Sequence, residues 1–367
     1  MSKFLVVSHT HGLLPFGHRL QREGHTVQPI VVIKQFESAW HGKLKPSPRD
    51  SKSLLSEDFI QETFTQARSE GWTVLTDSFQ LEKRLREEFK IPPSHLYGRL
   101  RFPDEPSSIL RVGGWFDGDR MGHLFGLIVE RGAWHGGMGP DIDGSLTLIR
   151  IDNLKAKSLM ESIIQKEVDE LKSLDFRGLV QFGLEFQTET GSPQVSGVGA
   201  GWPSLVTHGF LSETDNFEGL LLGGMDLPEP SQQSLQQSLT QQSQNADKFL
   251  AKKFVTVLPV SRPPWPTAKA RFRFSTDPVE GLTPQQMGRV FWHDVQVDQE
   301  AGQLRTAGLD GLIGVVRGAA DTSQLSLALA LETATRLQIP EKQFRTDAGQ
   351  QVQNTLAQLE QKFELVL

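Results

Sequence analysis

The sequence contains no cysteine. Without thiols the chain forms no disulfide bond, no zinc–thiolate site and no cysteine nucleophile, and such a composition suits a reducing compartment. It also lacks an apolar run of the roughly 18 to 20 residues needed to cross a bilayer. The apolar stretch at residues 4–7 is too short for the core of a signal peptide. The sequence therefore predicts a cytoplasmic protein that does not enter a membrane.

Positive charge is not in excess either, because 38 Lys and Arg residues stand against 44 Asp and Glu residues, a net charge of −6. Scaffolds that bind nucleic acid normally carry a basic face, so no nucleic-acid partner is predicted. The 367 residues are 37% hydrophobic and 22% charged, as in ordinary globular proteins. That length allows two or three domains. The expected partner is a small-molecule ligand or another protein.

Several motifs of known chemistry are missing from the chain. There is no GxxxxGK[ST] phosphate loop and no GxSxG nucleophile motif. The first turn after a strand, residues 8–12, is not GxGxxG, since side chains before Gly12 would crowd a pyrophosphate. His9, His11 and His18 lie near this turn without a carboxylate at a supporting spacing, so no metal site is predicted there.

The first part of the chain alternates between strand and helix patterns. Residues 4–7 form an apolar strand pattern, residues 13–23 carry apolar side chains at helical spacing, and residues 26–33 again read as a strand. The same alternation continues with a helix at 59–68, a strand at 72–75 and a helix at 80–89. Such a pattern predicts a parallel sheet in an α/β fold. Prolines between residues 92 and 107 indicate a domain boundary.

Antiparallel strands and amphipathic helices are expected after that boundary. Strands are predicted at 109–112, 115–116, 123–129, 178–186, 194–198, 254–259, 291–297 and 312–316, and helices at 154–174 and 325–337. Asp117, Gly118 and Asp119 predict a hairpin turn. Helical spacing also occurs at 205–221, whereas residues 231–245 form a Gln/Ser tract with almost no apolar content.

A glycine-rich loop at residues 136–139 is the most informative local motif. Several glycines close together let backbone N–H groups converge on an anion, although a plain tight loop explains the same residues. Carboxylates that could hold magnesium are Asp117, Asp119, Asp141 and Glu185. The first two of these are explained more simply as turn residues.

Five segments together resemble one enzyme family. They are Gly136-Gly-Met-Gly139, residues 176–184 (Phe-Arg-Gly-Leu-Val-Gln-Phe-Gly-Leu), residues 310–316 (Asp-Gly-Leu-Ile-Gly-Val-Val), Ala320-Asp-Thr322, and residues 344–349 (Phe-Arg-Thr-Asp-Ala-Gly). Their order and spacing are similar to those of glycinamide ribonucleotide synthetase, the phosphoribosylamine–glycine ligase (PurD-type) branch of the ATP-grasp superfamily. The resemblance covers nearly the whole chain and rests on the order of the motifs.

This resemblance implies an α/β, ATP-grasp-like fold in three parts. They are an N-terminal pre-ATP-grasp domain with a parallel sheet at 1–92, a reduced ATP-grasp domain at 93–245, and a small C-terminal α+β domain at 246–367. It also implies a substrate-binding role for Gly136, Gly137, Gly139, Asp321, Thr322, Arg345 and Asp347.

The sequence departs from the family at the metal-binding strand. The family pattern Glu-Phe-Asn-x-Arg aligns with residues 197–201, so that its metal ligands fall on Gly197 and Gly199 and its phosphate-facing Arg on Gly201. The segment before Trp115 is also too short for the family's ATP-clamping subdomain.

Two functions therefore stay open at the level of sequence. The first is a binding, regulatory or structural protein that has lost ATP-dependent chemistry and needs no cofactor. The second is an active carboxylate–amine ligase that uses ATP and Mg²⁺. A single fold can host either.

Overall fold

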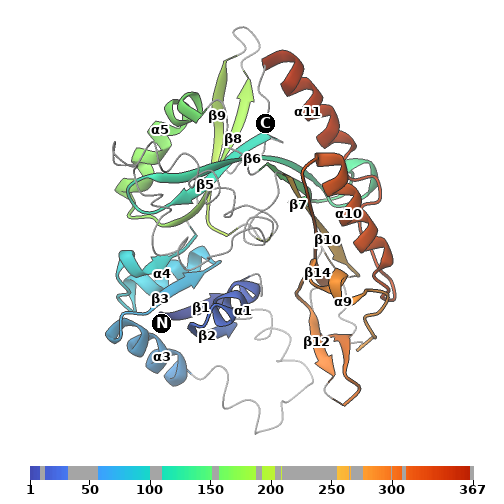
Figure 1. Ribbon diagram of the computed structural model, residues 1–367. Coiled ribbons are helices and arrows are strands. Elements are labelled where there is room, and N and C mark those ends of the chain that lie inside the picture. The colour runs from blue at the N-terminus through green and yellow to red at the C-terminus, as the bar shows by residue number, and fades with distance from the viewer. Residues whose placement is uncertain are drawn as a thin grey trace, which may run out of the picture.

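The structure is a computed structural model that describes most of the chain. The described residues are 1–8, 13–31, 57–99, 110–150, 157–186, 192–202, 208, 254–263, 265, 276–298, 300–307 and 311–363. They contain a four-stranded sheet, an eight-stranded sheet and a two-stranded ribbon (Figure 1). The Gln/Ser tract, His9 and His11 lie outside the described residues, as does all of the segment 205–221 except His208.

The small sheet is parallel and is formed by the N-terminal part of the chain. Its order is β2 (Thr26–Val31), β1 (Lys3–Ser8), β3 (Thr73–Thr76) and β4 (Leu96–Tyr97). Each neighbouring pair runs parallel. The parallel sheet predicted from the strand–helix alternation is confirmed.

Side chains of the central strand β1 are buried on both faces of this sheet. Phe4 and Val6 pack on the side of α1 (Leu14–Arg22). Leu5 and Val7 pack on the opposite side, in a cluster with residues of α3 (Glu57–Ser69) and α4 (Phe79–Glu87). The run of apolar residues at 4–7 is what a parallel sheet covered by helices on both faces requires.

The large sheet is antiparallel throughout. Its order is β11 (Val290–Trp292), β14 (Leu312–Ala320), β10 (Phe254–Ser261), β7 (Asp141–Arg150), β6 (Met121–Gly132), β5 (Leu110–Phe116), β8 (Gly178–Phe186) and β9 (Pro193–Ala200). Strands from both sides of residue 245 therefore belong to one sheet. The domain limits at 92 and 245 stay predictions.

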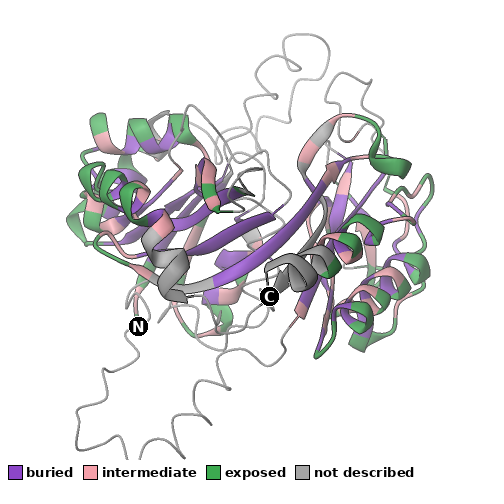
Figure 2. Cartoon of the chain, turned by 90° about the horizontal axis from the view of Figure 1, so that it is seen from above, coloured by how far each residue is buried: buried purple, intermediate pink, exposed green. Residues whose placement is uncertain are grey.

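The two faces of the large sheet meet different neighbours. One face packs against residues of α5 (Lys157–Ser173), α10 (Ser323–Arg336) and α11 (Gln350–Phe363). On the other face Trp115 and Val257 share a cluster with Phe4 and Phe16 of the N-terminal unit. Figure 2 shows the resulting pattern, with buried strands at the centre and helices whose outer sides are exposed. The sheet is thus the middle layer of the molecule.

Smaller elements complete the C-terminal part. They are α9 (Pro284–Met287), and the ribbon of β12 (Val295–Asp298) and β13 (Gln303–Thr306). The single strand predicted over 291–297 is wrong, because β11 pairs with β14 and the chain then turns at His293 to pair elsewhere. Strand β7 and helix α11 were not predicted. No helix in the described ranges is long and apolar enough to span a bilayer.

Candidate functional site

The glycine-rich loop joins β6 to β7 and closes on itself. Its ends are held by hydrogen bonds from Ala133 N to Pro140 O (3.1 Å) and from Trp134 N to Met138 O (2.9 Å). Gly136, Gly137 and Gly139 have φ angles of 72°, 70° and 86°. Glycine adopts this left-handed region without the steric cost that a Cβ atom brings. The glycines are therefore required by the shape of the loop itself.

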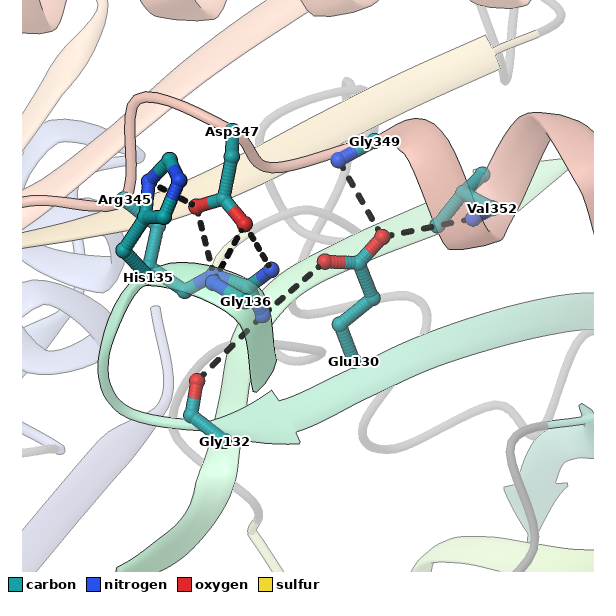
Figure 3. Close-up of polar contacts among 8 residues, drawn as sticks. All are labelled: Glu130, Gly132, His135, Gly136, Arg345, Asp347, Gly349 and Val352. Atoms are coloured by element: carbon teal, nitrogen blue, oxygen red, sulfur yellow. Dashed lines mark hydrogen bonds and ion pairs between the residues drawn. The ribbon is translucent and has the colours of Figure 1, made fainter. Parts of the chain in front are cut away.

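Asp347 binds this loop from a distant part of the chain. The backbone N–H of Gly136 donates to Asp347 Oδ2 at 2.7 Å. The ring atom His135 Nδ1 lies 3.3 Å from Asp347 Oδ1. Figure 3 shows the carboxylate between the loop and the arginine beside it. The structure thus brings together two motifs that the sequence resemblance assigned to the substrate side.

Arg345 holds Asp347 in place and reaches into the sheet. Its Nε and Nη2 donate to the two oxygens of Asp347 at 3.2 and 2.9 Å. Its Nη1 donates to Gly132 O at 3.3 Å and lies 3.1 Å from Glu130 Oε2. The arginine is only 7% exposed. Such a bidentate, charge-assisted pair fixes both position and orientation.

Glu130 completes the network from β6. Its Oε1 accepts hydrogen bonds from Gly349 N (3.1 Å) and Val352 N (3.2 Å), at the start of α11. The residue is 1% exposed. A carboxylate at a helix N-terminus satisfies backbone N–H groups that have no partner in the helix. Glu130 was not predicted as a site residue, since no motif marks it.

Asp347 is ionised at neutral pH. Hydrogen bonds from Arg345 are the largest cause that lowers the pKa of Asp347 from 3.8 to about 2, and the N–H of Gly136 adds to it against the effect of burial. Arg345 also contacts Glu130, so this one arginine lies between the side chains of Asp347 and Glu130. The network is a clamp that fixes the loop, and the imidazole of His135, which contacts Asp347 through Nδ1, is 75% exposed.

A cavity of about 370 Å³ adjoins this clamp. Aromatic side chains from three segments line it, namely Trp134, Trp265 and Phe344, together with His135. Lys342 also lines it, but its Nζ donates to the carbonyls of Ala334 (2.9 Å) and Thr335 (2.8 Å) at the end of α10. The size suits a small organic ligand, and the aromatic walls favour stacking of a planar group. We call the clamp and this cavity the loop–Arg345 site.

Asp321 and Thr322 lie elsewhere. Ala320, just before them, pairs with Phe254 at one end of β10, whereas Gln343 is hydrogen-bonded to Ser261 at the other end. Thr322 caps α10, its side chain accepting from Leu325 N at 3.3 Å. The structure does not bring these two residues to Arg345, and their substrate-binding role stays a prediction.

The positions of the family's metal ligands carry no donor side chains. On β9, Gly197 pairs with Gly183 of β8, and Gly199 pairs with Gln181. The side-chain oxygen of Gln181 accepts from Arg111 Nη1 at 3.2 Å. A divalent ion prefers carboxylate or carbonyl oxygens, and residues 197–201 carry no side-chain oxygen, so these positions do not fit a magnesium site.

The candidate carboxylates whose side chains the structure describes do not form a metal site in place of these glycines. Asp117 accepts from the N–H groups of Asp119 and Arg120, as the predicted hairpin turn requires. Glu185 is exposed and pairs with Gln194 toward the outer end of β8. Nowhere in the described ranges do three His, Cys, Asp or Glu side chains group in a way that could hold a metal ion. The side chain of Asp141 is outside the described part.

No protein-family profile and no curated protein sequence matches the chain. Several solved structures, in contrast, match the fold of the chain. Phosphoribosylamine–glycine ligase from Thermotoga maritima is 11% identical, with a TM-score of 0.50 over 94% of this chain and 99% of that one. Multifunctional pyruvate carboxylase from Rhizobium etli is 12% identical, with a TM-score of 0.51, and this chain covers 37% of it. The chain has the ATP-grasp fold, and the predicted resemblance to phosphoribosylamine–glycine ligase is confirmed at the level of fold.

Proposed function

We propose that this chain is a non-catalytic, cytoplasmic protein of the ATP-grasp fold. It binds a small ligand or a protein partner and no longer performs ATP-dependent ligation. Folds of this kind can keep a binding site after the chemistry is lost.

The observation that carries this proposal is the surface made by β8 and β9. An ATP-dependent ligase needs magnesium to bridge the phosphates and neutralise the charge that develops during transfer. Gly197 and Gly199 offer no side-chain oxygen there, and the neighbouring Gln181 is engaged by Arg111. Residues 197–201 therefore offer no side-chain oxygen that would anchor the ion.

The connection between the two sheets supports the same conclusion. Strand β4 ends at Tyr97 and strand β5 begins at Leu110, so residues 98–109 alone join them. A segment of this length is too short for an α/β subdomain that clamps ATP. The adenine and the phosphates of ATP would therefore lack the subdomain that clamps them in the family.

The loop–Arg345 site is where we place the ligand. Asp347 and Arg345 hold the loop rigid, with His135 exposed beside a cavity lined by Trp134 and Phe344. A site built on fixed backbone and aromatic walls binds with little loss of conformational entropy.

The experiment is a thermal unfolding scan with and without Mg-ATP. Binding to the native state at about 100 times the dissociation constant would add roughly 2.7 kcal/mol of stability. We expect no change in melting temperature at millimolar Mg-ATP. A clear rise that requires both magnesium and ATP would contradict the proposal.

An active ligase is the second candidate, and one contact favours it. The hydrogen bond from Gly136 N to Asp347 Oδ2 joins the glycine-rich loop to the Arg345–Asp347 motif. The sequence resemblance assigns both motifs to the substrate side. Release of ADP that depends on both an amine and a carboxylate would establish this alternative. Without such release under any combination of substrates, the non-catalytic proposal stands.

A further inference from the structure

Two histidines form a hydrogen bond at the contact between the N-terminal unit and the large sheet. His208, which lies between β9 and β10 in the sequence, is 1% exposed. Its Nε2 lies 3.1 Å from Nε2 of His293, which follows β11. The two imidazole rings are nearly parallel, with an angle of 13° between their planes. The function proposed above makes no use of this pair.

Aromatic rings from both units surround His208. It packs edge-to-face on Phe16 of α1, with ring centroids 5.8 Å apart, and on Phe291 of β11 at 4.9 Å. Phe16 in turn packs on Trp202, which follows β9, at 5.2 Å. His208 is therefore a direct link between α1 of the N-terminal unit and β11 at the edge of the large sheet.

The hydrogen bond between the two rings depends on their protonation. One Nε2 must carry a hydrogen and the other must offer a lone pair, so the bond is lost when both Nε2 atoms are protonated. A proton bound at the remaining nitrogens instead leaves a positive charge on buried rings, which burial disfavours. Burial is the largest cause that holds the pKa of His208 well below 6.5, and the neighbouring His293 adds to it. The pair is therefore built to be uncharged in the folded protein.

The cations around His208 also oppose its protonation. A cavity of about 560 Å³ borders it, and the other titratable side chains that line this cavity are His18, Arg19 and Arg22 of α1 and Arg317 of β14. None of the described residues that line the cavity is acidic. Like charges close together disfavour a further positive charge.

The carboxylates on the adjoining segments already accept hydrogen bonds. Glu23, at the end of α1, accepts from Arg19 Nε at 2.7 Å. Asp294, next to His293 and 5% exposed, accepts from Gly311 N at 3.0 Å. Arg289, just before β11, adds another cation to this element. The charges on the elements packed against the pair are thus mainly positive.

We propose that the His208–His293 pair is a pH-sensitive switch that holds α1 against β11 while it is uncharged and releases this contact when it is protonated. A charge enclosed by Phe16 and Phe291 is solvated better once the two elements separate. The proposal does not rest on the function proposed above, because His208 lines no part of the cavity of the loop–Arg345 site.

The direction of the pH dependence follows from the lowered pKa of His208. A histidine of this kind binds its proton only after the contact opens, so the contact is complete above 6.5 and weakens as the pH falls below that value. For one histidine with the ordinary pKa of 6.5 in the open state, the equilibrium constant for opening should rise about tenfold between roughly pH 7.5 and 5.5.

The experiment measures amide hydrogen exchange of the full chain at these two pH values, corrected for the intrinsic pH dependence of exchange. In wild type we expect the protection of amides in α1 and β11 to fall about tenfold at the lower pH. Amides of α5 and α11, which pack on the other face of the large sheet, should keep their protection. Unchanged protection in α1 and β11, or an equal fall throughout the chain, would overturn the proposal.

Three variants assign the effect to the pair. His208→Gln, which keeps a hydrogen-bonding side chain that does not titrate, should abolish the fall in protection. His293→Gln should reduce it, because an amide oxygen accepts a hydrogen bond from His208 Nε2 also when His208 is protonated, and it decides the question if His208→Gln does not fold. His95→Gln removes a histidine of the short helix at Pro93–His95 and should leave the wild-type response intact. A wild-type response in both variants of the pair would also refute the switch.

Discussion

At the scale of single residues, Asp347 is the centre of the loop–Arg345 site. Its pKa is lowered from 3.8 to about 2 by Arg345, so its contribution to stability is complete above 3.8 and is lost as the pH falls toward 2. We predict that Asp347→Asn lowers the free energy of unfolding at pH 7 by about 1–3 kcal/mol. The difference from wild type should shrink as the pH falls through that window. Urea unfolding at a series of pH values measures both effects.

Asp119→Asn is the matched control for this substitution. Asp119 is 83% exposed and pairs with Lys172 at 3.0 Å. Exposed ion pairs contribute little, so the variant should stay within about 0.5 kcal/mol of wild type. A loss in Asp347→Asn no larger than in Asp119→Asn would show that the clamp does not stabilise the loop.

The sequence predicted part of this site and missed the residue that joins it to the sheet. The glycine loop and the Arg345–Asp347 motif were identified by resemblance, and the structure brings Gly136 and Asp347 together. Glu130 was missed because it lies near the end of an apolar strand and belongs to no motif. Its hydrogen-bond partner Gly349 is 219 residues away in sequence. Only the pairing of β6 with its neighbours and the docking of α11 reveal that contact.

At the scale of secondary-structure elements, Glu130 anchors the start of α11. Its Oε1 accepts from Gly349 N and Val352 N, and its other oxygen faces Arg345. We predict that Glu130→Ala costs about 3–5 kcal/mol, since it leaves a buried arginine without this carboxylate. Amide hydrogen exchange should accelerate most at residues 349–352. Glu130→Gln, which keeps an acceptor oxygen, should protect these amides better than Glu130→Ala; equal exchange rates in both variants would contradict the anchoring role.

Helix α10 lies directly on β14 at Gly318. A Cβ atom at this position would stand 2.0 Å from Ser326 O and 2.7 Å from Ala330 N, both backbone atoms of the helix. We predict that Gly318→Ala lowers stability by at least about 1–3 kcal/mol, because the helix must move away from the sheet. Gly288→Ala is the control, since its nearest contact would be 3.4 Å. Thermal unfolding of the two variants should differ clearly, and similar melting temperatures would refute this packing.

Elements with strong periodicity were predictable, and those without it were not. Strand β1 and helices α1 and α4 follow their apolar patterns closely. Strand β7 begins Asp141-Ile-Asp-Gly-Ser, which reads locally as a turn, and becomes a strand by pairing with β6 and β10. Helix α11 is rich in glutamine, and the Glu130 carboxylate at its start comes from β6. In both cases tertiary contacts outweigh local preference.

At the scale of the whole molecule, Arg86 connects the N-terminal unit to the turn between α5 and β8. Arg86 of α4 donates to the carbonyls of Leu174 (3.3 Å) and Asp175 (3.2 Å), beyond the end of α5. It also pairs with Glu82, whose side chain is 5% exposed. Burial raises the pKa of Glu82, and Arg86 opposes that shift. One arginine therefore neutralises a buried carboxylate and links two units.

Removing this arginine should loosen the contact between the units in a pH-dependent way. We predict that Arg86→Gln costs roughly 2–4 kcal/mol at pH 7, less than a fully buried pair because Arg86 is 24% exposed. A carboxyl whose pKa is raised in the folded state is most favourable at low pH, where it is protonated. The cost should therefore decrease as the pH is lowered, when Glu82 no longer buries a charge. Arg84→Gln on the same helix breaks an exposed pair with Glu88 and a contact with the Phe89 ring, whose centroid lies 5.9 Å from the guanidinium carbon. Its cost in urea unfolding should be smaller than that of Arg86→Gln and should not decrease as the pH is lowered. A cost in Arg86→Gln that does not change with pH would mean that its backbone hydrogen bonds, and not the charge of Glu82, hold the two units together.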